Sequence, residues 1–355
     1  MRVEQVLLEL LSQYTPTGSE HRLAETMKGL AERLGYDDFE IDGAGNYLLR
    51  RGRGAKTLLL AGHVDTVPGE LEWGLRGGEV YGRGAVDAKG PLAAMLVGAS
   101  VARIDPAEAS VIVAGLVDEE GEGRGAQELV RRGVRVDGAV VGEPTGGNGV
   151  AVSYRGSLTV RISATARGGH SSAPYMGDSA LEKLLNVIQD IRLTFAGRSY
   201  EDPTSAVTQI RAGDWPTKLP ESAEAIVNIR YPPGLETVSI LERVEAAVSL
   251  YGCRMEVLDT TEPVATRLTS PVVRALTRSI LRQGAKPRIL KKTGASDMNI
   301  LYRLTGNIAA YGPGNSLLAH TSEEVVSVAD LEFAAKVIAR AVEEFLSGSA
   351  TAREG

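Results

Sequence analysis

Three almost continuous apolar runs in the first half of the chain constrain its fold most strongly. They are TLLLAG at 57–62, SVIVAGLV at 110–117 and DGAVVG at 137–142, and a helical apolar period covers residues 90–104. Strands that are apolar at nearly every position are typical of a sheet that helices cover on both faces. The sequence therefore predicts an α/β fold with a mixed, largely buried sheet flanked by helices. Two helices are expected ahead of it.

The first of these helices is predicted at 2–12 and the second at 19–34, capped near Thr17 or Ser19. The middle of the chain has another pattern. Its predicted elements are a strand at 157–167, a helix at 178–195, strands at 204–212 and 221–231, a helix at 236–250 and a strand at 254–258. The order β-α-β-β-α-β is that of the ferredoxin-like α+β unit.

Helical patterns return after Pro263, at 270–283 and 328–347. We therefore predict two domains. A discontinuous catalytic domain consists of 1–155 and 265–355, and 156–264 form a small domain inserted into it.

Composition excludes several classes of protein. The single cysteine, Cys253, rules out an internal disulfide and a thiolate metal cluster, so any metal ion must bind histidine and carboxylate groups. A net charge of -6 argues against a nucleic-acid partner. Neither a leader pattern nor an apolar stretch near 18 residues occurs, so we expect no membrane partner and a cytoplasmic protein.

The chain has only four histidines, and His63 follows the apolar run that ends at Leu60. Ligands of open α/β sheets bind at the carboxyl ends of strands, where this side chain is expected. Asp65 is spaced to accept the other ring N–H of His63, as carboxylates do in metal sites. Asp87, in YGRGAVDAKG before a helix, is either an N-cap or a carboxylate shared by two metal ions. Taken alone, His63 is also compatible with an ordinary loop histidine.

Further acidic residues follow the other apolar runs. Glu119 and Glu120 lie in DEEGEGRG, where adjacent carboxylates are costly unless something neutralises them, although a solvated acidic loop is the simpler alternative. Glu143 lies in VGEPT, and His320 in YGPGNSLLAHTSEE. Two histidines with several carboxylates suit zinc, cobalt or manganese. A pair of such ions needs roughly this number of ligands.

Through these motifs, in this order and over essentially the whole chain, the sequence resembles the di-zinc amidohydrolases that include aminoacylase, acetylornithine deacetylase, succinyl-diaminopimelate desuccinylase and a glutamate carboxypeptidase. The resemblance implies two divalent metal ions, zinc or alternatively cobalt. It implies that one ion binds His63, Asp87 and Glu143, and the other Asp87, Glu120 and His320. It further implies that Glu119 is the general base and that a cis peptide bond follows Asp87.

The resemblance extends to the predicted inserted domain. His170, in GGHSSAP, matches a family histidine that reaches the reacting oxygen from a partner subunit, which implies a homodimer through this lid and dimerisation domain. On its own it is an ordinary surface-turn residue. Arg230 matches an arginine that binds a substrate carboxylate, and Gly294 and Ser296 match a segment near the substrate. Residues 217–220, TKLP, depart from the asparagine of many relatives, so recognition of the acyl group is not carried over.

Within the family the chain most resembles the hydrolases that release lysine or ornithine from the C-terminal glutamate of an acidic carrier protein, LysW. The alternatives are a deacylase of free N-acetylornithine or succinyl-diaminopimelate, and a non-catalytic metal-binding relative. An acidic carrier needs a basic surface. Two arginine clusters are candidates, although a solvated, salt-bridged face is the simpler explanation of either one. The clusters are Arg131, Arg132 and Arg135, and Arg155, Arg161 and Arg167.

Overall fold

The structure is a computed structural model that describes residues 1–347, and the chain divides into two compact units. The first unit comprises Met1–Val152, Thr266–Leu290 and the chain from Ser296 onward. The second comprises Ser153–Ala265 and Lys291–Ala295. This last segment lies outside the stretch 156–264, whose assignment as an inserted domain stays a prediction.

The first unit is built on a mixed sheet with the order β1-β2-β6-β3-β7-β17-β8. The strands are β1 (Asp38–Ile41), β2 (Tyr47–Arg51), β3 (Lys56–His63), β6 (Ala109–Leu116), β7 (Gly138–Val141), β8 (Gly149–Tyr154) and β17 (Ile308–Ala310). The central strand β3 runs parallel to β6 and β7, whereas β2 pairs antiparallel with β6. Every residue of β6 is buried. The predicted α/β fold with a buried mixed sheet is therefore confirmed.

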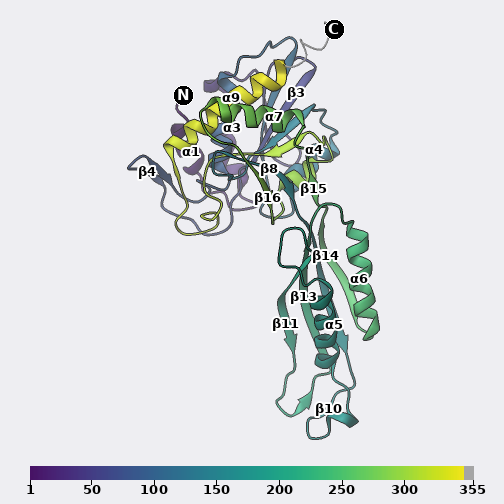
Figure 1. The fold of residues 1–355 in the computed structure, drawn as a ribbon. Helices are drawn as coiled ribbons and strands as arrows, with labels where there is room; N and C mark the ends of the chain where they lie inside the picture. Colours follow the sequence, from purple (N-terminus) through teal and green to yellow (C-terminus); the bar gives the residue numbers. More distant parts are fainter. Residues whose placement is uncertain (348–355) are drawn as a thin grey trace, which may run out of the picture. The chain divides into compact units, whose positions relative to one another are not determined.

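Helices pack on this sheet. They are α1 (Val3–Leu11), α2 (Ala24–Leu34), α3 (Lys89–Val101), α4 (Arg124–Arg131), α7 (Pro271–Arg282), α8 (Asp297–Leu301) and α9 (Val328–Ser347). Helices α1, α3, α7 and α9 lie against one another, and α3 and α9 also contact β3 (Figure 1). In the described part of the chain, no helix combines the length and the apolar character that a membrane span requires.

Shorter elements complete the first unit. They are β4 (Gly74–Arg76), β5 (Glu79–Tyr81) and β18 (Val325–Ser327), which form a small sheet, and β16 (Arg288–Lys292), which pairs with β8 and whose last two residues belong to the second unit.

The predicted cap of the second helix is wrong. A 3-10 turn, Glu20–Leu23, precedes α2, and Ser19 makes no side-chain capping hydrogen bond. The hydroxyl of Thr17 instead donates to Asp65 Oδ2 at 2.9 Å. A contact with a distant carboxylate has replaced the local cap.

The second unit follows the predicted β-α-β-β-α-β order. Its main elements are β9 (Gly156–Thr165), α5 (Ala180–Thr194), β11 (Thr204–Ala212), β13 (Ser222–Tyr231), α6 (Thr237–Leu250) and β14 (Arg254–Thr261). Its small strands are β10 (Gly169–His170), β12 (Lys218–Leu219) and β15 (Val264–Ala265). The four long strands form an antiparallel sheet in the order β11-β13-β9-β14, so β11 and β14 are its edges. The helices cover one face, as alternating strand burial predicts.

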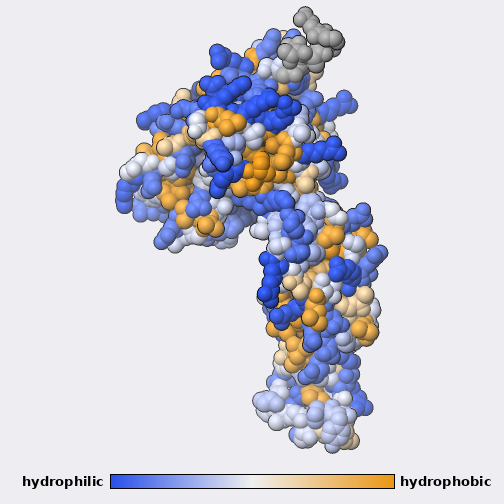
Figure 2. All heavy atoms as spheres, viewed as in Figure 1, coloured by the Kyte–Doolittle hydropathy of each residue, from blue (hydrophilic) through white to orange (hydrophobic). Residues whose placement is uncertain are grey.

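Apolar side chains remain exposed on the second unit, whose surface carries several apolar areas in Figure 2. On the edge strand β11, Val207 is 38% and Ile210 is 49% exposed. An edge strand with exposed apolar side chains is a surface suited to pairing with another chain.

Candidate metal centre

The candidate site lies at the carboxyl ends of parallel strands. His63 is the last residue of β3, and it pairs in register with Leu116, the last residue of β6. Glu119 and Glu120 follow β6 within four residues, so the parallel pairing brings both glutamates beside His63. The strand ends thus supply the cluster that their sequence positions predict.

Histidine and carboxylate donors gather there in two groups. The first contains His63, Glu119 and Glu120, and the second contains Asp87, Glu120 and His320. Within each group, one ligand atom per residue lies within 4.8 Å of the others. Glu120 is common to both groups, which is compatible with two neighbouring cations.

Asp87 lies between the two histidines. Its Oδ1 is 3.3 Å from His63 Nε2, and its Oδ2 is 3.3 Å from His320 Nε2. The N-cap of α3 is Ala88, without a side-chain capping bond, so the alternative role of Asp87 as a helix cap is wrong. The peptide bond between Asp87 and Ala88 is cis, as the family resemblance predicts.

Glu143 stands apart from these groups. It follows β7 as predicted and is half-buried, but neither of the two donor groups includes it. The group around His63 contains Glu119, the predicted general base, and Glu120, but not Glu143. The assignment of Glu143 as a ligand stays a prediction.

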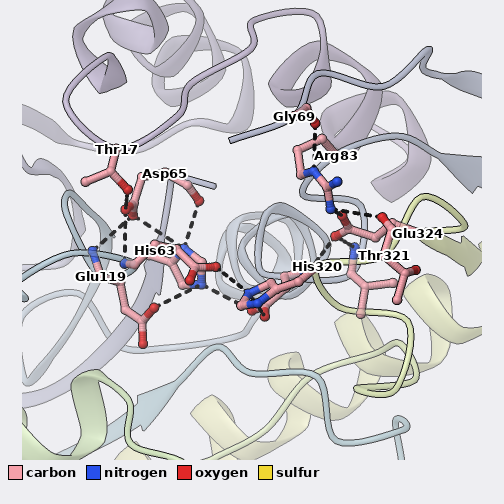
Figure 3. A network of polar contacts seen from close by, with 12 residues as sticks. Thr17, His63, Asp65, Gly69, Arg83, Glu119, His320, Thr321 and Glu324 are labelled. Carbon is pink, nitrogen blue, oxygen red and sulfur yellow. Dashed lines mark hydrogen bonds and ion pairs between the residues drawn. The ribbon is translucent and has the colours of Figure 1, made fainter. Parts of the chain in front are cut away.

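Asp65 connects the histidine to both glutamates (Figure 3). His63 Nδ1 lies 2.9 Å from the backbone oxygen of Asp65 and 3.5 Å from its carboxylate, so the closer partner of the ring N–H is the carbonyl. The Asp65 carboxylate instead accepts hydrogen bonds from the backbone N–H groups of Glu119 and Glu120, both at 3.1 Å. Asp65 therefore orients the acidic segment as well as the imidazole.

Two residues without a predicted role hold the same segment. Asp118 has a φ of 65°, and its Oδ2 accepts hydrogen bonds from the backbone of Glu122 and from Arg124 Nε. Its own N–H donates to Glu20 Oε1 at 3.1 Å. The acidic run is thus an ordered turn and not a solvated loop. Nothing local in the sequence pairs Glu20 with Asp118.

The crowding of carboxylates dominates the electrostatics. Burial, together with Asp87, Glu120 and Asp65, raises the pKa of Glu119 to about 7, although His63 opposes this shift. Burial also raises the pKa of Asp297, which lies near Glu119, well above its usual value. Such a cluster is stable in ionised form only when cations neutralise it. The nitrogen and oxygen donors fit divalent ions of the zinc type.

The histidines respond to the same carboxylates. Burial opposes a charge on His63, yet Glu119, Asp65 and Asp87 raise its pKa well above the usual value. A hydrogen bond to Asp87 and the charge of Glu120 raise the pKa of His320 to about 9. Burial disfavours the charge on Asp87, but the two histidines lower its pKa below the usual value. The carboxylates of the cluster therefore favour a positive charge on both His63 and His320.

Two of the remaining predicted residues, His170 and Arg230, belong to the second unit. In the second unit, His170 is exposed on β10, where its Nδ1 is 2.8 Å from Ser172 Oγ. Arg230 on β13 donates through Nε to Asn228 Oδ1 at 3.0 Å, while its Nη1 is buried without a hydrogen-bond partner.

The predicted substrate segment is divided between the two units. Gly294 belongs to the second unit, with open space around its Cα. Ser296 belongs to the first, where its hydroxyl caps α8 by accepting from Met298 N at 3.2 Å. The substrate roles of Gly294 and Ser296 stay predictions.

Three of the six arginines in the two clusters form ion pairs. The pairs are Arg131–Glu128 at 2.6 Å, Arg132–Glu40 at 2.9 Å and Arg161–Glu256 at 2.6 Å. Arg155 is only 4% exposed and donates to the backbone oxygen of Arg230. For these four arginines, a salt-bridged or buried position explains the sequence cluster better than a basic surface for an acidic carrier does.

The fold places the chain in a class. It superposes on the crystal structure of aminopeptidase PepT from Bacillus cereus with a TM-score of 0.82, at 18% identity, over 97% of this chain and 98% of the other. At this identity the match concerns the fold alone. The histidine and carboxylate cluster at the strand ends makes this a fold with a candidate site for divalent metal ions.

The family follows from the sequence match. Residues 59–344 match the peptidase family M20/M25/M40, and the chain belongs to this family. A relative from Aeropyrum pernix, "Putative [LysW]-lysine/[LysW]-ornithine hydrolase", is 42% identical over 95% of this chain and 94% of its own length. A "[LysW]-lysine/[LysW]-ornithine hydrolase" from Saccharolobus islandicus is 34% identical over 97% and 96%. The predicted reaction class and family are confirmed.

Proposed function

We propose that this protein releases lysine, ornithine or both from the C-terminal glutamate of an amino-group carrier protein of the LysW type, in lysine or arginine biosynthesis. The observation that carries the proposal is the match, along almost the whole length of both chains, with relatives that bear this activity in their names. The ordered cluster of histidines and carboxylates supports a catalytic protein over a metal-binding relative without activity.

The proposed cofactors are two zinc ions, with cobalt as an alternative. One ion would bind His63, Asp87 and Glu143, and the other Asp87, Glu120 and His320. The 3.3 Å distances from the two Asp87 oxygens to the two histidines support a shared carboxylate. Asp65 would keep His63 in the tautomer whose Nε2 faces the metal, which its carbonyl contact with Nδ1 supports.

Glu119 is the proposed general base. Bound zinc ions would polarise the scissile carbonyl and lower the pKa of a nearby water molecule. Glu119 then takes a proton from the attacking water and gives it to the departing amino group of the amino acid. The position of Glu119 supports this role, because its backbone is held by Asp65 and its carboxylate lies 3.9 Å from His63 Nε2, beside the proposed ligands.

The second unit supplies the proposed lid and dimer contacts, with 156–264 as the inserted domain and 1–155 with 265–355 as the catalytic domain. In a cytoplasmic homodimer, His170 would act at the site of the partner subunit. The exposed apolar side chains on the edge strand β11 support a partner chain there.

Arg230 is the proposed ligand of a substrate carboxylate, and Gly294 and Ser296 are the other proposed substrate-binding residues. The buried Arg230 Nη1, which has no hydrogen-bond partner, supports this role, because an unpaired guanidinium N–H favours an anionic ligand.

A panel of substrates tests the proposal. Zinc-loaded protein is incubated with the lysine and ornithine adducts of the carrier, with N-acetylornithine and with succinyl-diaminopimelate, and the released amines are quantified. We expect release from a carrier adduct. Rapid turnover of a free metabolite without release from either adduct would identify a deacylase, and no turnover of any substrate would favour the non-catalytic alternative.

A further inference from the structure

Glu324 is a buried carboxylate that contacts the segment bearing Asp87. It is 2% exposed and follows His320 by four residues. Its Oε1 accepts hydrogen bonds from the backbone N–H groups of Val86 and Asp87, both at 3.0 Å. These bonds fix the backbone from which the Asp87 carboxylate extends toward the two histidines.

Arg83 binds the other oxygen of Glu324 and extends the network to two more segments (Figure 3). Its Nη1 lies 3.0 Å from Glu324 Oε2 and donates to the backbone oxygen of Thr321 at 3.0 Å. Its Nε donates to the backbone oxygen of Gly69 at 2.9 Å. One ion pair thus joins the loop after β3, the segment of Asp87 and the segment of His320.

The network contacts the two loop segments that carry Asp87 and His320. His63 ends a strand and is held by the sheet, whereas Asp87 and His320 lie in loops. His320 also has a φ of 65°, a conformation that its surroundings must maintain. Thr321, the next residue, is the one that Arg83 binds. The Arg83–Glu324 pair therefore restrains both loop residues at their backbones.

From these contacts we infer that the Arg83–Glu324 pair is a positioning device for the metal centre. It holds Asp87 and His320 at the separation in which both bind the same cation, without touching that cation or the substrate. The inference rests on the proposed metal-binding roles of Asp87 and His320. An ion pair that only stabilised the fold would leave the affinity for metal unchanged.

Zinc binding to the metal-free protein tests the inference. Glu324→Gln retains an acceptor for the two N–H groups but removes the charge that holds Arg83. Arg83→Met removes all three guanidinium contacts. Loss of a group that orients metal ligands typically weakens metal binding about 10–100-fold. We expect a loss of this size for the Zn²⁺ ion that binds both Asp87 and His320, and a smaller loss for the ion that shares only Asp87 with it, measured by calorimetric titration against a competing chelator.

A matched control separates positioning from stability. Asp137 also accepts a backbone hydrogen bond, from Thr57 N at 2.8 Å, but at the end of β3 opposite to His63. Asp137→Asn is expected to lower the melting temperature while both zinc affinities stay unchanged. The double variant Arg83→Gln with Glu324→Gln leaves neither member of the pair charged, so it tests the inference if a single variant fails to fold.

The possible outcomes are distinguishable. If the parent protein binds two Zn²⁺ ions and the folded variants bind both equally well, the pair is only structural and the inference is wrong. If the parent protein binds no Zn²⁺, the proposed metal centre itself fails and the inference fails with it. Weaker binding of the Zn²⁺ ion that Asp87 and His320 share, in the folded variants alone, supports both the proposed metal centre and the positioning role of the pair.

Discussion

At the scale of single residues, the position of Glu119 decides what it can do. Its backbone N–H is fixed by the Asp65 carboxylate, and its own carboxylate lies 3.9 Å from His63 Nε2. It therefore stands beside the donor cluster with a defined orientation. Two roles are compatible with this place, a metal ligand or the proposed general base.

The variant Glu119→Gln distinguishes the two roles. An amide cannot accept the proton of the attacking water, so we expect kcat to fall about 10²–10⁴-fold. Zinc content, measured by elemental analysis, should stay at the parent level. Glu122→Gln is the matched control, because this exposed glutamate lies in the same turn, and it should retain the parent kcat. A drop in zinc content for Glu119→Gln would instead assign Glu119 as a ligand.

The raised pKa of Glu119 predicts how pH affects the metal-free protein. The folded state holds a proton up to about pH 7, whereas the unfolded chain loses it near 4.5. The folded state thus binds more protons between these values, and the stability of the parent falls as pH rises through this window. Glu119→Gln removes this effect. One pKa unit is equivalent to about 1.4 kcal/mol, so the rise of the pKa from 4.5 to about 7 predicts that the metal-free variant gains on the order of 3 kcal/mol above pH 7.

Urea unfolding of both metal-free proteins measures this gain. The difference in unfolding free energy between variant and parent should be smaller at about pH 5 than at about pH 8, because the parent Glu119 retains most of its proton at the lower value. An equal difference at the two pH values would contradict the raised pKa.

At the scale of elements, the close approach of α3 and α9 determines how the segment after Asp87 is supported. A Cβ atom at Gly98 of α3 would lie 2.7 Å from the backbone oxygen of Ala335 and 2.8 Å from Ile338 Cβ, both in α9. These distances leave no room for a side chain. Because α3 begins two residues after Asp87, this contact between helices also supports the metal centre.

Gly98→Val is therefore expected to lower the stability of the protein. Overpacking of this kind costs about 1–3 kcal/mol, and the melting temperature reports it. Gly29→Ala in α2 is the matched control, because the only atom within 4 Å of its new methyl group is Arg33 Nη2 at 3.8 Å. An alanine in an open helix position stabilises by up to about 1 kcal/mol. A stable Gly98→Val protein would mean that α3 and α9 separate easily.

At the scale of the whole molecule, the proposed homodimer divides each active site between two chains. Glu119 would act in its own chain and His170 in the partner's site. Two inactive variants should then complement each other, because a hybrid dimer contains one complete site. A monomeric enzyme has no such complementation.

Refolding an equal mixture of His170→Ala and Glu119→Gln chains measures this effect. Random pairing should restore about a quarter of the parent activity, since half of the dimers are hybrids with one complete site each. Each variant refolded alone is the control. Light scattering checks that the mixture is dimeric. A dimeric mixture without recovered activity would show that His170 acts within its own chain. Activity of the His170→Ala protein refolded alone would show that His170 has no role in catalysis.

Much of the fold was predictable, because the pattern of apolar residues along a short segment indicates which of its faces will be buried. The apolar runs predicted β3, β6 and β7, and the strands predicted at 157–167 and 221–231 correspond to β9 and β13 of the second unit. Short strands such as β4 and β18, of three residues each, carry too few positions for a period to be recognised. These short strands were therefore missed. His63, Glu119 and Glu120 were predictable because they follow apolar strands whose ends meet.

What the sequence alone determined is thus the set of elements and the residue types at their ends, since both depend on neighbours along the chain. The tertiary structure decided which polar groups hold that set in place. Thr17 binds Asp65 across 48 positions, Glu20 accepts from Asp118 across 98, and Arg83 binds Glu324 across 241. No periodicity or local spacing encodes such pairs, because their geometry exists only after the sheet has brought the loops together.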